Sequence, residues 1–130
     1  MKKRLVDKAI KARELAYSPY SNFCVGAALL SADGEIFTGV NIENASYGAT
    51  VCAERSAFAA AVSAGKRDFE AIAIVGAPAG EDIGELCFPC GICRQFMLEF
   101  CSENFEIILF DGKNIVTKTL GEILPCGFRL

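Results

Sequence analysis

Three cysteines and one glutamate are the residues of this sequence best suited to chemistry. Glu54 follows Cys52 by two positions, and Cys90 and Cys93 stand three apart. Residues three apart share one face of a helix, so the sulfurs of Cys90 and Cys93 can hold a single ion. Taken alone, this pair has three interpretations, namely a metal site, a dithiol redox centre, or a coincidence within a hydrophobic core.

Adding Cys52 favours a catalytic zinc ion. Three thiolates leave one tetrahedral position open, and an open position is typical of catalytic zinc, which lowers the pKa of a bound water to about 7. Glu54 is placed to handle the protons. Three thiolates also carry surplus negative charge, which would weaken that acidifying effect. We expect Arg55 and two helix N-termini aimed at the sulfurs to offset it.

The composition removes several classes of function. The chain contains no histidine, so Ser-His and Cys-His catalytic arrangements are excluded. Its seven cysteines are an odd number, and the N-terminus reads as an amphipathic helix instead of a secretory signal. We therefore expect a reducing, cytoplasmic location, where clustered cysteines bind metals or catalyse reactions.

Charge and hydropathy argue against two kinds of partner. The net charge is −3, the sequence pI is about 5.0, and no block of Lys and Arg stands out. A nucleic acid polymer or an anionic membrane is therefore not expected to bind. No apolar run approaches the roughly 18 residues that cross a bilayer, so no membrane-spanning segment is expected either.

A single α/β domain comprising residues 1–130 should position these side chains. The length of 130 residues and the 52% hydrophobic content suit one core. Patterning predicts a three-layer α/β/α architecture with a mixed sheet of about five strands. The predicted helices are 2–17, 52–64 and 90–101, with a helical turn in 119–124; the predicted strands are 23–30, 35–43, 69–76, 105–110 and 115–118. Both cysteine-bearing segments would then begin helices that follow loops.

Longer motifs connect the sequence to a known family. "CAER" at 52–55 together with "PCGICRQ" at 89–95 resembles the zinc nucleoside deaminases, specifically the small homotetrameric cytidine deaminases whose first ligand is cysteine. The resemblance extends to "SPYSNFCVGAALL", "GVNIENASYGAT" and "ILPCGF". It implies a cytidine deaminase-like fold, with one Zn²⁺ per subunit on Cys52, Cys90 and Cys93 and with Glu54 carrying protons. The implied reaction converts cytidine or deoxycytidine to uridine or deoxyuridine plus ammonia, in pyrimidine salvage.

Asn41 and Glu43 are candidates for sugar recognition. They are two apart in a strand-like segment, so they should share a face and offer an amide and a carboxylate to hydroxyl groups, unless they form only a solvated strand end. The resemblance implies that they bind the ribose 3′-hydroxyl. It also implies that Ala45 and Tyr47 reach a neighbouring subunit's substrate near the 5′-hydroxyl.

Four further residues acquire roles only through the resemblance. By its place in a buried strand, Phe23 would be a core residue; the family likeness makes it a stacking partner of the pyrimidine. Phe128 would be an aromatic contact contributed from another subunit. Ala53 would hydrogen-bond the base through its backbone, and Pro89 would shape the exit for ammonia.

Other interpretations stay open on sequence alone. Cys87 precedes Cys90 by three and could close the site into a structural four-sulfur centre, although Pro89 stiffens that approach. Cys24 and Cys126 are expected to be core or interface thiols, and Cys101 to pack at a helix end. The alternatives to a cytidine deaminase are a blasticidin-S-type deaminase of a modified nucleoside and a non-catalytic zinc or thiol module. A polynucleotide-editing deaminase is disfavoured by the acidic balance.

Overall fold

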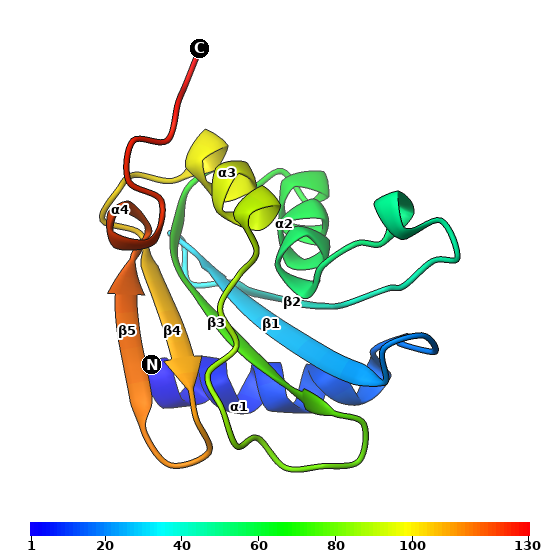
Figure 1. Cartoon of the computed structure of the whole chain (residues 1–130). Helices are drawn as coiled ribbons and strands as arrows, with labels where there is room; N and C mark the ends of the chain where they lie inside the picture. The colour runs from blue at the N-terminus through cyan, green and yellow to red at the C-terminus, as the bar shows by residue number, and fades with distance from the viewer.

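A five-stranded mixed sheet forms the centre of the computed structural model, which describes residues 1–130 (Figure 1). The strands are β1 (Phe23–Ser31), β2 (Ile36–Val40), β3 (Phe69–Pro78), β4 (Glu106–Phe110) and β5 (Ile115–Thr119), in the order β2-β1-β3-β4-β5. Strands β3 and β4 run parallel, and every other neighbouring pair is antiparallel. The predicted mixed sheet of about five strands is confirmed.

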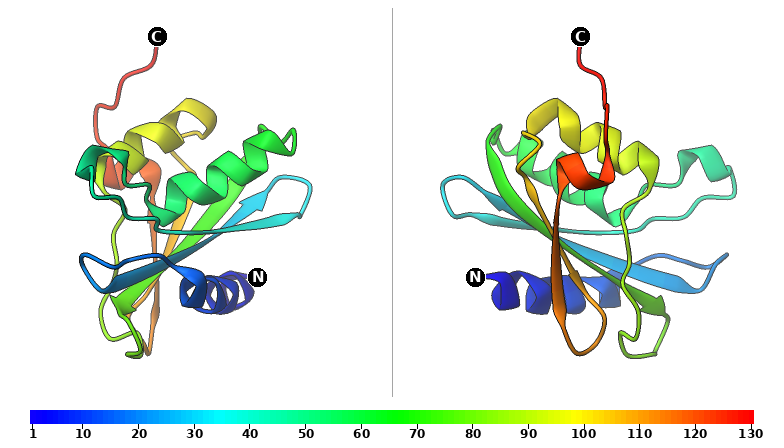
Figure 2. Two further views of the ribbon diagram at one scale, coloured as in Figure 1. Left: turned by 90° about the vertical axis from the view of Figure 1, so that its right-hand side faces the viewer. Right: turned by 60° about the vertical axis from the view of Figure 1, so that its left-hand side comes forward.

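Helices cover both faces of this sheet. Helix α1 (Lys2–Ala12) lies on one face, whereas α2 (Ala53–Ser63) and α3 (Gly91–Phe100) lie on the other (Figure 2). The short α4 (Leu120–Ile123) follows β5 and begins with a capping box between Thr119 and Glu122. The three-layer arrangement predicted from the sequence is therefore present. None of the helices is long and apolar enough to cross a membrane.

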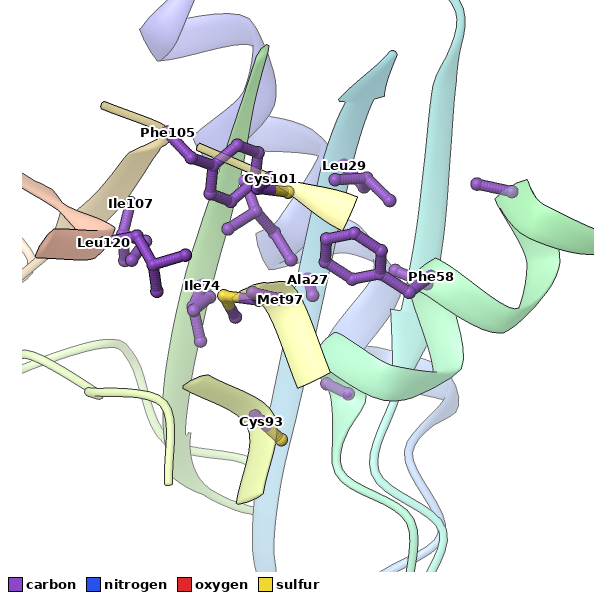
Figure 3. Close-up of a cluster of buried hydrophobic side chains, with 14 of the residues drawn as sticks. Ala27, Leu29, Phe58, Ile74, Cys93, Met97, Cys101, Phe105, Ile107 and Leu120 are labelled. Atoms are coloured by element: carbon purple, nitrogen blue, oxygen red, sulfur yellow. The ribbon is translucent and has the colours of Figure 1, made fainter. Parts of the chain in front are cut away.

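Strand alternation divides the buried residues into two cores. On β1, Ala27 and Leu29 face α2 and α3, whereas Ala28 and Leu30 face α1. The larger core surrounds Phe58 of α2, whose ring contacts four other phenylalanines: Phe69, Phe96, Phe100 and Phe105. Cys93 and Met97 of α3 belong to the same core (Figure 3). Of the metal-ligand candidates, Cys93 is therefore part of the larger core, and Cys52 packs against it.

Two glycines in adjacent strands let the helices approach closely. A Cβ added at Gly26 of β1 would lie 2.1 Å from Ala9 O of α1, and one at Gly39 of β2 would lie 2.3 Å from Ala57 N of α2. Both obstacles are backbone atoms that cannot swing aside. Glycine at these positions therefore sets the distance between each helix and the sheet.

Two predicted elements end earlier than their sequence patterns suggest. The helix predicted for 2–17 stops at Ala12 and tightens into a 3₁₀ turn (Arg13–Leu15), and the strand predicted for 35–43 stops at Val40. The reason is tertiary pairing: Ile42 bridges both Tyr17 and Val51, so the chain leaves each regular element to form these bridges. Asn41 and Glu43 consequently lie beyond the end of β2 and not within it.

Candidate metal centre and its surroundings

The three predicted ligand sulfurs lie together where α2 and α3 begin. Cys52 is the N-cap of α2, Cys90 is the N-cap of α3, and Cys93 lies in the first turn of α3. The Sγ atoms are 3.7 Å apart for Cys52 and Cys90 and 3.4 Å apart for Cys90 and Cys93. Tetrahedral zinc with Zn–S bonds of about 2.3 Å places its sulfurs about 3.8 Å apart. The donor atoms and their spacing therefore fit a zinc ion.

Cys87 does not join this group. The three sulfurs all lie within 4.8 Å of one another, and Cys87 is not among the cysteines that meet this limit. Its Sγ packs instead over Gly76 of β3, where an added Cβ would lie 2.8 Å from it. Burial raises the pKa of the Cys87 thiol to about 11, which keeps it protonated. The four-sulfur alternative therefore lacks its fourth ligand.

Positive charge reaches the sulfurs from the predicted sources. Cys52 and Cys90 occupy the N-cap positions of α2 and α3, so the positive ends of two helix dipoles lie beside the cluster. Arg55 Nη2 lies 3.6 Å from Cys52 Sγ and 3.3 Å from Thr50 O. Hydrogen bonding with Cys93, followed by the contact from Arg55, lowers the pKa of Cys52 below that of an ordinary thiol.

The guanidinium of Arg55 has one buried nitrogen without a hydrogen-bond partner. Its Nε is buried and has no hydrogen-bond partner, while its Nη2 is shared between Thr50 and Cys52. A guanidinium carries five N–H donors, and a buried donor without a partner is costly. That cost is consistent with a side chain retained for its charge beside the sulfurs.

Glu54 stands next to the cluster in the first turn of α2. It is 4% exposed, one of few buried polar residues of the chain. Burial, reinforced by the nearby Cys52 charge, raises the pKa of Glu54 to about 7. A buried carboxyl group that is balanced between its two forms near neutrality can both accept and donate a proton.

The amide of Asn41 holds the start of β1. Its Oδ1 accepts a hydrogen bond from Val25 N at 2.9 Å, and its Nδ2 donates one to Phe23 O at 2.9 Å. An amide offers two N–H donors and two acceptor lone pairs. One N–H and one lone pair of Asn41 therefore remain for another molecule.

Glu43 is bound by the loop before β1. Its Oε1 accepts hydrogen bonds from Tyr20 N and Ser21 N, each at 3.0 Å, and its Oε2 accepts one from the Ser21 hydroxyl. The Ser21 bonds lower the pKa of Glu43, so the carboxylate stays ionised. A hollow of about 260 Å³ opens beside it, lined by Tyr20, Ser21, Glu43, Asn44, Tyr47 and Thr50.

Phe23 is not the core residue that its strand would suggest. Its side chain is 38% exposed, and its ring rests against Gly76, where an added Cβ would lie 2.7 Å from Phe23 Cε2. One side of the ring is thus supported by β3 while part of the ring remains open to solvent. This arrangement suits a platform for a flat ligand.

The residues expected to serve other subunits are exposed. Tyr47 is 78% exposed and Phe128 68% exposed, and Ala45 is exposed as well. The Tyr47 ring contacts Tyr20 edge to face, with 6.4 Å between centroids. Ala53 begins α2 with a buried side chain, and buried Pro89 immediately precedes Cys90 of the sulfur cluster. Large aromatic side chains left uncovered in this way suit contact with another molecule.

Helix α3 also holds the C-terminal segment, a feature that the sequence did not reveal. Arg94 donates to Pro89 O at 2.8 Å and to Ile123 O at 2.6 Å, and Gln95 Nε2 donates to Phe128 O at 3.0 Å. Arg94 and Gln95 stand within the "PCGICRQ" motif, but their C-terminal partners, Ile123 and Phe128, lie 29 and 33 residues away in the chain. Only the folded topology identifies them.

Comparison with known proteins agrees with this geometry. The family model described as "Cytidine and deoxycytidylate deaminase zinc-binding region" matches residues 1–109. A cytidine deaminase of Sporosarcina psychrophila is 47% identical over 96% of this chain and 89% of its own length. A blasticidin-S deaminase of Bacillus cereus is 36% identical over 95% of this chain and 89% of its own length.

Solved structures show the same fold. The crystal structure of a cytidine deaminase from Burkholderia pseudomallei has a TM-score of 0.89 and 44% sequence identity, and the match covers 98% of this chain and 99% of that one. The arrangement of sheet and helices is therefore that of a cytidine deaminase structure.

Proposed function

The chain belongs to the cytidine and deoxycytidylate deaminase family, and on that premise we propose how its residues hydrolyse cytidine and deoxycytidine to the uracil nucleosides and ammonia. The observation that carries this proposal is the meeting of three sulfurs at two helix N-termini beside a buried carboxyl group. A closed structural site would need a fourth protein ligand and would leave the position of Glu54 without a purpose.

Cys52, Cys90 and Cys93 hold the zinc ion in this proposal. Bound there, zinc would supply the Lewis acidity that lowers the pKa of a water molecule. Arg55 partly neutralises the sulfur charge through its contact with Cys52 Sγ. The helix N-termini contribute in the same direction.

Glu54 moves the protons. It takes one proton from the water that attacks C4 of the base and delivers it to N3. It then takes the second proton from the hydroxyl now on C4 and gives it to the exocyclic amino group, which leaves as ammonia while the C4 carbonyl forms. Its burial supports this role, because a carboxyl group shielded from solvent exchanges protons with the bound base and not with bulk water. Pro89, next to the ligand Cys90, shapes the path by which ammonia leaves.

The substrate is held from three directions. Asn41 keeps a free N–H and Glu43 a free acceptor site, so together they can bind a 3′-hydroxyl, which both accepts and donates. The open side of Phe23 stacks on the pyrimidine, and the backbone of Ala53, as the first residue of α2, hydrogen-bonds the base. These contacts favour an unmodified cytosine nucleoside over a blasticidin-type substrate.

We extend the proposal to assembly and location. The exposed residues Ala45, Tyr47 and Phe128 complete a neighbouring subunit's site within a homotetramer, and the chain acts as a single catalytic domain in pyrimidine salvage. Three ligand thiols must stay reduced, and none of the cysteines forms a disulfide, which supports a cytoplasmic location.

A loss of ultraviolet absorbance on mixing the zinc-loaded protein with cytidine tests the activity directly. The expected result is conversion to uridine, with ammonia formed in equal amount, and much slower conversion of blasticidin S. Glu54→Gln should keep its zinc and fold while losing turnover by a factor of at least about 10²–10⁴. Wild-type rates in this variant would refute the assigned role.

A further inference from the structure

Ser21 connects the predicted sugar-binding carboxylate to the predicted base platform. Its hydroxyl donates to Glu43 Oε2 and accepts a hydrogen bond from Phe23 N at 3.1 Å. A serine hydroxyl has a single hydrogen to donate, and here Glu43 receives it. The orientation of this hydroxyl therefore depends on Glu43, and the N–H of Phe23 depends on the hydroxyl for its hydrogen-bond acceptor.

Asn41 fixes the same residue from its other side. While Ser21 binds the N–H of Phe23, the Asn41 amide binds the carbonyl of Phe23 at 2.9 Å. The two peptide groups that flank the Phe23 side chain are thus held by Ser21, which binds Glu43, and by Asn41. The ring itself rests on Gly76.

The backbone between Ser21 and Phe23 makes this connection tight. Asn22 has a positive φ of 59°, a conformation that asparagine tolerates better than most residues. Its N–H bonds Ser18 O at 3.0 Å, and its carbonyl accepts from Ala79 N at 2.8 Å. The turn is therefore anchored on both sides. Backbone N–H groups of Tyr20 and Ser21 bind Glu43 Oε1, and the Ser21 hydroxyl is the one side chain of the loop that binds both Glu43 and the Phe23 amide.

We propose that Ser21 is a positioning residue, which sets the Phe23 platform relative to Glu43 so that binding of the sugar and stacking of the base act as one unit. This inference rests on the proposed function, because it assigns Ser21 a role through two residues of that site. Ser21 is exposed, so water can replace its hydrogen bonds when the hydroxyl is removed. The fold should therefore survive its loss, whereas the placement of the ring should not.

The test compares Ser21→Ala with Ser102→Ala. Ser102 is an exposed serine remote in sequence from the site, and its hydroxyl accepts a hydrogen bond from the backbone N–H two residues later at 3.3 Å, as that of Ser21 does. Ser21→Ala should raise the KM for cytidine by about tenfold, the scale of one hydrogen bond to a charged group. Its kcat, zinc content and melting temperature should stay close to wild type. Ser102→Ala should leave the KM unchanged, and Ser21→Thr, which keeps the hydroxyl, should restore most of the affinity.

A double-mutant cycle identifies the residue through which Ser21 acts. In a Phe23→Leu background, Ser21→Ala should raise the KM by less than about twofold. An undiminished effect in that background, or a KM for Ser21→Ala equal to that of Ser102→Ala, would overturn the inference. If Ser21→Ala does not fold, Ser21→Cys tests the same link, because a thiol is a poor hydrogen-bond partner. Failure of the proposed function is separate, since the wild-type protein would then not deaminate cytidine at all.

Discussion

Gly39 of β2 lies directly against Ala53, the first residue of α2. A Cβ added at Gly39 would come within 2.5 Å of Ala53 O, closer than any unstrained contact allows. Helix α2 can therefore pack this close to the sheet only because residue 39 has no side chain. The same helix carries Cys52 as its N-cap and Glu54 in its first turn.

Gly39→Ala should damage both stability and the metal site. Overpacking of this kind costs about 1–3 kcal/mol of unfolding free energy, and the displaced α2 should weaken zinc binding. Denaturant unfolding of the chelator-treated protein and a zinc competition titration measure the two effects. Gly84→Ala is the matched control, because an added Cβ there meets nothing within 4 Å. Equal zinc affinity in the two variants would contradict this account of α2.

X-ray absorption should find three sulfurs and one lighter atom around the zinc ion. Cys90→Ser should remove one sulfur from this shell and weaken binding, whereas Cys87→Ser should leave the shell unchanged, because Cys87 stands outside the sulfur group. A wild-type spectrum with four sulfurs, or one that changes in Cys87→Ser, would assign Cys87 to the metal after all.

Mixing two impaired variants should restore activity if Phe128 serves a neighbouring subunit. Phe128→Ala should raise the KM for cytidine without loss of zinc, and Glu54→Gln should abolish turnover. In mixed assemblies some sites combine Glu54 from one chain with Phe128 from the other, so turnover at low cytidine concentration should exceed the average of the separate proteins. Activity equal to that average would mean that Phe128 acts within its own subunit or not at all.

Acid should weaken the fold partly through Asp33. Its pKa is lowered by a hydrogen bond from Lys66, whose Nζ lies 2.6 Å from Oδ2, and by another from Ser31. A depressed carboxyl pKa contributes stability above its unfolded value of about 3.9, and this contribution is lost as the pH falls below that value. Asp33→Asn should therefore be less stable than wild type at pH 6 and should lose less stability between pH 5 and pH 3.

The control for this prediction is Asp7→Asn. Asp7 lies 4.0 Å from Lys3 Nζ on the exposed side of α1 and makes no other ion pair. Its variant should follow the wild-type curve of unfolding free energy against pH. Parallel curves for wild type and Asp33→Asn would contradict the assigned role of Asp33.

Local patterns in the sequence predicted the sheet and the sulfur site. Cys90 and Cys93 share a helix face because of their spacing, and the alternation in β1 reports its two buried sides. Gly39 carries no such signal, since its role depends on a helix that follows more than ten residues later. The strand pattern did not predict the partial exposure of Phe23 either, because the position of its ring depends on a contact with Gly76 of β3, which is distant in the sequence.

The two elements that end earlier than predicted also show that local sequence patterns do not reveal long-range contacts. The pattern of 2–17 is helical throughout, yet Tyr17 leaves the helix to bridge Ile42. Hydrogen bonds from Arg94 and Gln95 to the C-terminal segment likewise join residues 29 and 33 positions apart. Long-range partners of this kind follow from topology, which propensity and periodicity do not encode.

The sulfur cluster also ties together two helix starts that are distant in the chain. Cys52 and Cys90 are separated by 38 positions, and the chain contains no disulfide. A cation shared between them closes that loop much as a covalent bridge would, and restricting an unfolded loop of this size is worth about 4 kcal/mol in the chain-entropy model. Removal of the metal would then destabilise the folded chain as well as inactivate it, so the metal-free protein should unfold at a lower denaturant concentration.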